Sequence, residues 1–196
     1  MTNFRGYFKS FYRTGIECMG LEAVEIILGW ENAFGIKLSD DEAETLQTPQ
    51  MAIELICSKV GAIVNSTGVC LEARAYYRIR KAFCDVVGLS RKEIQLDSKL
   101  VNFLPRKQRQ EMWKSVYLSA GFPKLPNLKF GVGVFFLPIT LRDVVDEIVV
   151  HYPSFLASED ERWTRSQVRS VVQAVVRIVV RRCDFQDDDD FSRLGI

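Results

Sequence analysis

Apolar residues recur every three or four positions along several stretches of the chain, which is the spacing of amphipathic helices. The first stretch runs from Leu21 to Phe34 and is followed by Gly35, a residue type favoured just after a helix. We therefore predict a helix over residues 21–34 with one buried stripe. The residues expected in this stripe are Leu21, Val24, Ile27, Leu28, Ala33 and Phe34.

Two shorter helices are expected next. Ser39 precedes the acidic run 40–42, so it can cap a short helix whose first turn favours negative charge. Thr48 and Pro49 have the residue types preferred at the N-cap and at the first position of a helix. The chain over residues 21–60 thus predicts a long, a short and a medium helix joined by short links.

This pattern over residues 20–56 resembles the last three helices of an acyl carrier protein. The shared features are the motif Glu-x-x-Phe-Gly-Ile at residues 31–36, the acidic short helix, and Thr-Pro at the start of the last helix. In that family an Asp-Ser-Leu motif opens the first of these helices, and its serine carries 4′-phosphopantetheine. Here Met19, Gly20 and Leu21 stand in that place. The resemblance implies a carrier fold that has no hydroxyl at Gly20 and holds no cofactor.

The resemblance also implies a docking surface. Partners of the family recognise acidic residues on the helix that follows the serine, and Glu22, Glu25 and Glu31 are retained at such positions. These three residues are our candidates for contact with a partner protein.

A second set of helices has a similar rhythm. One helix is predicted from Leu71 to Gly88, one from Pro105 to Gly121, and one from Thr140, as N-cap, to about Tyr152. Their expected inward residues are Ala75, Ile79, Ala82, Phe83, Val86, Val87, Met112, Trp113, Val116, Tyr117, Ala120, Leu141, Val144, Val145, Ile148 and Val149. This region resembles a second, weaker carrier-type bundle.

The C-terminal segment predicts one more helix, capped by Thr164 and rich in valine. Its apolar residues are Val168, Val171, Val172, Val175, Ile178 and Val179. The segment resembles the first helix and acidic loop of a carrier, with Phe185 and Phe191 as the apolar anchors of the loop. Its last residues, "FSRLGI" (191–196), repeat four of the six residues of "FYRTGI" (11–16), just before the first predicted helix.

The two ends of the chain therefore complement each other. A valine stripe does not remain in water, and three helices with one face missing make a poor core, so we expect residues 164–196 to pack on residues 17–60. Within one chain this gives a circularly permuted carrier fold, and between two chains it gives a homodimer that swaps residues 164–196. In a third alternative, a substitute helix covers the first module instead, formed by residues that include Phe4, Tyr7, Phe8, Phe11 and Tyr12.

We therefore predict an all-α fold of two acyl-carrier-like helical bundles, the first completed by the C-terminal helix. The first bundle comprises residues 1–65 plus 160–196, and the second comprises residues 70–155.

Charge is distributed unevenly between these modules although the net charge is only +1. Residues 17–59 hold nine acids against two bases, and residues 71–129 hold thirteen bases against five acids. The two modules are expected either to attract each other across an interface or simply to carry solvated helix faces. The basic residues Arg106, Lys107 and Arg109 are predicted to bind an acidic protein surface, because the interleaved aromatics and basic net charge typical of nucleic-acid binding are missing.

The composition gives little reason to expect an enzyme or a metal-binding protein. His151 is the sole histidine and falls at a predicted helix C-terminus, which leaves no zinc motif and no spare histidine for a catalytic triad. Five cysteines without a Cys-x-x-Cys pair favour reduced thiols and a cytoplasmic protein. The longest apolar run, residues 130–139, is far shorter than the roughly 20 residues of a membrane span. We expect no catalytic residue, no metal and no membrane or nucleic-acid partner.

Two functions remain open at this level. The first is a non-catalytic carrier-like protein that docks on enzymes of fatty-acid, polyketide or related acyl transfer, or on another carrier. The second is a structural or regulatory helical-bundle protein unrelated to acyl transfer, since a fold does not determine a function.

Overall fold

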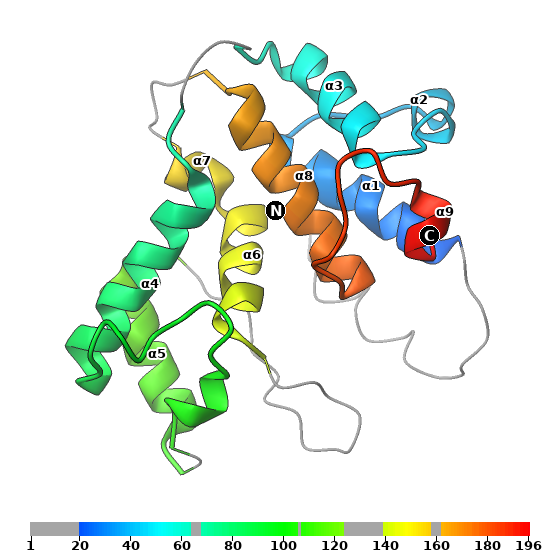
Figure 1. Cartoon of the computed structure of the whole chain (residues 1–196). Coiled ribbons are helices and arrows are strands. Elements are labelled where there is room, and N and C mark those ends of the chain that lie inside the picture. Colours follow the sequence, from blue (N-terminus) through cyan, green and yellow to red (C-terminus); the bar gives the residue numbers. More distant parts are fainter. Residues whose placement is uncertain (1–19, 64–67, 106, 124–138, 158–161) are drawn as a thin grey trace.

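The computed structural model describes residues 20–63, 68–105, 107–123, 139–157 and 162–196 (Figure 1). These residues form an all-α structure, as predicted, with two isolated β-bridges and no strand among them. The helices are α1 (Leu21–Phe34), α2 (Asp40–Glu44), α3 (Pro49–Val60), α4 (Leu71–Val87), the 3₁₀ helix η2 (Leu100–Asn102), α5 (Arg109–Ala120), α6 (Leu141–His151), α7 (Pro153–Leu156), α8 (Arg165–Val180) and α9 (Phe191–Leu194).

Hydroxyl caps fix where four of the helices begin. The Ser39 hydroxyl accepts the N–H of Glu42 at the start of α2, and the Glu42 carboxylate accepts the N–H of Ser39 in return. Thr140 and Thr164 form the same reciprocal arrangement at the starts of α6 and α8. Thr48 caps α3, with Pro49 at its first position. These four predicted N-caps are confirmed.

Helix α5 begins later than the sequence predicts. The predicted start was Pro105, but the helix begins at Arg109. Leu104 is fully buried, and the Gln108 N–H donates to the Pro105 carbonyl at 3.1 Å, so the chain makes a turn here before it becomes helical. The side chain of Arg109 also donates through Nε to the Leu104 carbonyl at 3.2 Å, which satisfies a backbone acceptor that a longer helix would use.

The first core combines both ends of the described chain. It holds the fully buried Trp30 of α1, Ile53 and Ile56 of α3, and one side of α8. The Trp30 indole Nε1 donates to the backbone carbonyl of Val172 at 3.3 Å, which fixes α1 against α8. Figure 1 shows α8, in orange, lying between α3 and α6 and beside α1. The buried residues of the first core are Ile26, Trp30, Leu38, Ala52, Ile53, Ile56, Cys57, Val168, Val172, Val175, Val176, Phe185 and Leu194.

The C-terminal loop closes this core. Phe185 is buried in it, and the ring of Phe191 lies 6.3 Å from the ring of Trp30, measured between centroids. Both phenylalanines therefore act as the anchors that the sequence predicts. The Phe191 N–H donates to the Gln47 carbonyl at 2.9 Å, which joins the C-terminal segment to the link between α2 and α3.

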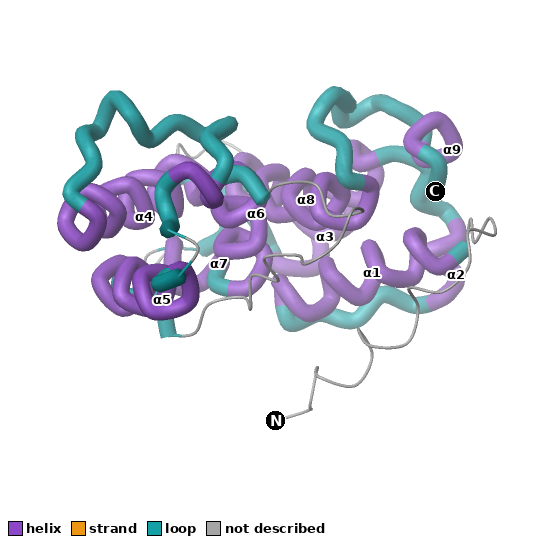
Figure 2. Tube along the Cα trace, turned by 90° about the horizontal axis from the view of Figure 1, so that it is seen from below, coloured by secondary structure: helices purple, strands orange, loops and turns teal. Residues whose placement is uncertain are grey.

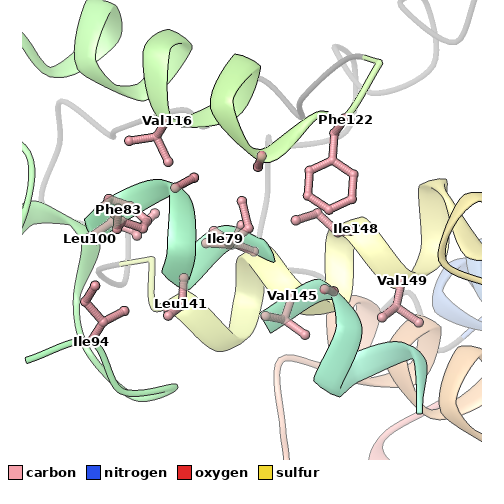
Figure 3. Close-up of a cluster of buried hydrophobic side chains, with 14 of the residues drawn as sticks. Ile79, Phe83, Ile94, Leu100, Val116, Phe122, Leu141, Val145, Ile148 and Val149 are labelled. Carbon is pink, nitrogen blue, oxygen red and sulfur yellow. The ribbon is translucent and has the colours of Figure 1, made fainter. Parts of the chain in front are cut away.

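The second core is formed by α4, α5, α6, α7 and the loop before α5. Ile79 and Phe83 of α4 face Val116 of α5 and Ile148 of α6 across it (Figure 3). Two residues of α8, Val171 and Ala174, also belong to this core. The same helix therefore contributes to both cores, which the sequence analysis did not predict. Val86 was expected to face inward, but its side chain is 36% exposed near the end of α4.

The predicted division into residues 1–65 plus 160–196 and residues 70–155 stays a prediction. The aromatic residues proposed for a substitute helix lie among residues 1–19, outside the described residues. The four described cysteines, Cys57, Cys70, Cys84 and Cys183, are free thiols. Within the described ranges, no helix has the length and hydropathy needed to cross a membrane.

Candidate functional site

The start of α1 is the position at which the carrier resemblance places the serine that bears phosphopantetheine. Gly20 is the N-cap of this helix, is exposed, and supplies no side-chain hydrogen bond to the helix end. Its φ of −114° lies in a region open to any residue. A Cβ built on Gly20 meets no atom of the described residues within 4 Å. The position therefore has room for a side chain, and glycine is not required there by backbone conformation or by crowding.

The predicted stripe of α1 is confirmed in part, because Ile27, Ala33 and Phe34 are partly buried against the cores. Ile26 and Trp30 are buried, whereas Leu21, Val24 and Leu28 are 40%, 52% and 48% exposed. The large indole decides the rotation of the helix, because burying a tryptophan removes more apolar area from water than burying a leucine or valine.

Gly29 permits the close approach that accompanies this rotation. A Cβ at Gly29 would lie 2.7 Å from Cγ1 of Val175 in α8, which is too close for two carbon atoms. Only glycine therefore lets α1 lie this near to α8 with Val175 in place. Reading the apolar spacing alone missed this contact, because glycine was not counted as a packing residue.

The outward side of α1 carries a mixed stripe. Leu21, Val24, Glu25 and Leu28 are all exposed, and their spacing of three and four residues puts them on one face. We call these four residues the α1 stripe. It combines apolar contact area with one carboxylate, which is chemistry suited to binding a protein surface.

The three predicted docking acids occupy different environments. Glu25 is exposed in the α1 stripe. One carboxylate oxygen of Glu22, Oε2, is buried and has no hydrogen-bond partner among the described residues. Glu31 is tied down, because its carboxylate accepts the Leu38 N–H at 2.8 Å and pairs with Lys37 at 3.4 Å. Glu25 is thus the freest of the three for contact with a partner, and Glu31 holds the loop between α1 and α2.

The predicted basic residues lie elsewhere in the molecule. Arg106 is outside the described residues, Lys107 is exposed just before α5, and Arg109 begins α5. Figures 1 and 2 both show α5 and α1 at opposite ends of the molecule. Among the described residues, the acidic candidates therefore lie on a different surface from Lys107 and Arg109.

An ion network that the sequence analysis missed links the two cores. Arg177 of α8 donates to both carboxylate oxygens of Asp146 in α6, at 2.9 and 2.7 Å, and to Glu72 of α4 at 2.7 Å. Asp146 is 3% exposed, and its burial raises the pKa of the carboxyl although the Arg177 hydrogen bonds oppose this. Burial by itself would lower the pKa of Arg177, but the hydrogen bonds and charge of Asp146, together with Glu72, outweigh it and raise that pKa.

The polarity of this network is opposite to the expected attraction between the modules. The base, Arg177, comes from α8, which packs on the acidic first module. The acids, Asp146 and Glu72, come from helices of the basic second module. A cavity of about 260 Å³ adjoins the network and is lined partly by Tyr76 and Leu96. The signal that could have pointed to a second interface is the number of valines on α8, which exceeds what one buried face needs.

We also considered metal binding and the place of His151 in the described part of the chain. In the part of the chain that the structure describes, no three His, Cys, Asp or Glu side chains gather so that they could hold a metal ion. His151 lies at the C-terminal end of α6, where its Nδ1 is 2.9 Å from the Glu147 carbonyl. Its place at the end of the helix matches the prediction.

Comparison with known proteins shows a partial similarity to acyl carrier proteins. A stretch of 42 residues is 43% identical to an acyl carrier protein of Thermosynechococcus vestitus. It covers 21% of this chain and 52% of that protein, so the chain spans about half the length of this curated relative. No family model matches the chain, and no solved structure matches it. The chain is thus acyl-carrier-like over a limited stretch.

Proposed function

We propose that this chain is a non-catalytic acyl-carrier-like protein that docks on acyl-transfer or synthase enzymes without carrying an acyl group. The observation that carries the proposal is Gly20 at the N-cap of α1, where the resemblance places the serine that bears phosphopantetheine. Glycine has no oxygen to form the phosphodiester, so the arm cannot be attached at this position. The similarity to an acyl carrier protein over 42 residues supports the carrier-like character of the chain.

The packing of α8 supports a permuted carrier-like unit. In this proposal α8 takes the role of the first carrier helix, and α1, α2 and α3 take the roles of the three that follow. The Trp30–Val172 hydrogen bond and the shared first core are the contacts in favour of this assignment. The hydrogen bond from Phe191 to Gln47 brings the end of the chain back to the α2–α3 link.

The docking role is assigned to the α1 stripe. Val24 and Leu28 would supply apolar contact, and Glu25 would pair with a cation on the partner enzyme. A single exposed ion pair contributes modestly to affinity, so most of the binding free energy is expected from the apolar residues. Glu31 is left out of this role because its carboxylate is occupied by Leu38 and Lys37.

Loading with phosphopantetheine tests the claim that no arm is carried. The chain is incubated with coenzyme A and a promiscuous phosphopantetheinyl transferase, and its intact mass is measured. We expect no mass gain for the natural chain and a gain of one phosphopantetheine group for Gly20→Ser, because the position has room for the serine side chain. A mass gain by the natural chain would refute the loss of loading. Failure of a folded Gly20→Ser variant to gain mass would count against the carrier-like assignment of α1.

Binding to a carrier-dependent acyltransferase or synthase tests the docking claim. Titration by isothermal calorimetry should give measurable binding for the natural chain, and Val24→Glu should weaken it at least tenfold. Glu25→Lys should weaken it less. Glu111→Lys, which reverses an exposed acid on α5, is the matched control and should leave binding unchanged. Equal effects of Val24→Glu and Glu111→Lys would show that the α1 stripe is not the docking surface.

The second candidate is a structural or regulatory helical bundle. Its supporting observation is that α8 contributes residues to both cores, so the two cores share one helix. A chain that binds no acyl-transfer enzyme, and whose Gly20→Ser variant is not loaded, would favour this alternative.

A further inference from the structure

Unpaired charges are mostly of opposite sign at the two ends of the molecule, with Glu111 of α5 and Arg193 of α9 as exposed exceptions. At one end, five exposed cations make no ion pair or side-chain hydrogen bond with the described residues, and we call them the basic end. They are Arg91, Lys92, Lys99, Lys107 and Lys114. At the other end, four exposed carboxylates are equally without a partner among the described residues, and we call them the acidic end. They are Asp40, Asp41, Glu44 and Asp188.

The acidic end is assembled from two stretches far apart in the sequence. The Gln50 N–H donates to the Asp187 carbonyl at 2.7 Å, and the Phe191 N–H donates to the Gln47 carbonyl at 2.9 Å. These bonds hold the loop that contains Asp188 beside the chain that follows α2. Negative charge from α2 and from the loop before α9 therefore accumulates on one side.

The two charged ends cannot neutralise each other within one chain. Figures 1 and 2 place α2 and α9 on one side of the molecule and α4 and α5 on the other. The ion network between the cores uses Arg177, Asp146 and Glu72, none of which belongs to either end. The opposite charges of the ends are thus available for contacts between molecules.

We propose that the basic end of one copy binds the acidic end of a second copy. The net charge of +1 means that two copies feel little overall repulsion, while the ends attract. Because a different surface is used on each partner, the contact is heterologous and adds further copies unless the ring closes. Attraction between exposed charges is screened by salt, so the association is expected at low ionic strength and is lost at high ionic strength. This inference is independent of the function proposed above.

Sedimentation velocity of the full chain tests the proposal. It is run over a range of protein concentrations in roughly 20 mM and roughly 0.5 M salt, where the screening lengths differ several-fold. A reducing agent is present, because Cys70 and Cys183 are exposed thiols that could cross-link copies. We expect the weight-average sedimentation coefficient to rise with concentration at low salt and to stay at the monomer value at high salt. A chain that is monomeric at low salt would overturn the proposal, including the case in which the basic end serves a different acidic protein.

Two charge-reversed variants locate the contact. Variant one carries Asp41→Lys, Glu44→Lys and Asp188→Lys, so that both of its ends are basic. Variant two carries Lys99→Glu, Lys107→Glu and Lys114→Glu, so that both of its ends are acidic. All six positions are exposed, and circular dichroism checks that both variants are folded.

Each variant alone should be monomeric at low salt, and an equimolar mixture of the two should associate. Association of either variant alone, or no association of the mixture of folded variants, would place the contact on other surfaces and overturn the proposal.

Discussion

The two cores of this molecule are built in different ways. The second core draws nearly all of its residues from one continuous region, 71–156, with only Val171 and Ala174 added from α8. The first core needs both ends of the described chain: α1 and α3 from the beginning, and α8, Phe185 and Leu194 from the end. Loss of the C-terminal segment would therefore remove one wall of the first core and only a small part of the second.

Helix α8 packs between the two cores and contributes residues to each. Val172 and Val175 face the first core, and their neighbours Val171 and Ala174 face the second. Arg177 lies on the part of α8 that is largely covered by the second module, and its charge is balanced there by Asp146 and Glu72. Folding of either core should thus depend on the other through this one helix.

Trp30→Ala should have the largest effect on stability. The side chain is fully buried at the centre of the first core, and the change should lower the free energy of unfolding by about 3–5 kcal/mol. Urea denaturation followed by far-UV circular dichroism measures this loss. Leu28→Ala, at an exposed position of the same helix, is the control and should cost less than about 1 kcal/mol. Similar losses for the two variants would contradict the observed rotation of α1.

Arg177→Met should come next, at about 3 kcal/mol, because it leaves the buried Asp146 carboxylate without its partner. The double variant Arg177→Met/Asp146→Leu should recover much of this loss, since well-packed apolar residues can replace a buried ion pair. The exposed pair between Arg169 and Asp187 provides a control, and Arg169→Met should cost about 1 kcal/mol or less. A double variant no more stable than Arg177→Met would contradict the proposed cause.

Val171→Ala and Val172→Ala compare the two faces of α8 directly. Both side chains are fully buried, so each change should cost about 2 kcal/mol from lost apolar contact. If the cores fold as one unit, both variants should shift a single unfolding transition by similar amounts. The measurement is urea denaturation followed by tryptophan fluorescence in a Trp163→Phe background, because Trp30 and Trp113 lie in different cores whereas Trp163 packs against both. Two separated transitions, each sensitive to one variant, would show that the cores unfold independently.

Gly29→Ala should have the smallest effect and the most informative sign. Alanine favours a helix by about 1 kcal/mol over glycine, but its Cβ would collide with Val175, and overpacking costs about 1–3 kcal/mol. We expect a net loss of about 1 kcal/mol in thermal or urea unfolding. In a Val175→Ala background the collision is removed, and Gly29→Ala should become stabilising. The same sign in both backgrounds would mean that α1 and α8 do not approach this closely.

Much of this fold could be predicted from local sequence signals. The caps Ser39, Thr48, Thr140 and Thr164 act through side chains close in sequence to the bonds that they make, so spacing alone identifies them. The predicted start of α5 at Pro105 was wrong, because the buried Leu104 and the turn after it, rather than the proline itself, decide where that helix begins.

The orientation of α1 could not be predicted in the same way. Apolar residues occur on several sides of this helix, and the choice between them depends on Trp30 and Gly29 meeting α8 far along the chain. Only part of the candidate site could likewise be predicted from the sequence. Gly20 follows from comparison of motifs, whereas the unequal roles of Glu22, Glu25 and Glu31 depend on contacts that only the folded chain defines.

A disulfide between α1 and α8 would test most directly whether the two ends of one chain form the first core. The Cβ position at Gly29 lies 3.7 Å from Cβ of Val175, within the range of about 3.5–4.5 Å found in disulfides. The double variant Gly29→Cys/Val175→Cys is oxidised at low protein concentration, and peptide mapping identifies the linked residues. Each single variant serves as a control for the native thiols.

We expect a linkage between residues 29 and 175 in a species that migrates as a monomer on a non-reducing gel. The same linkage in a covalent dimer would show that residues 164–196 are exchanged between chains. Absence of the linkage would contradict the packing of α8 on α1.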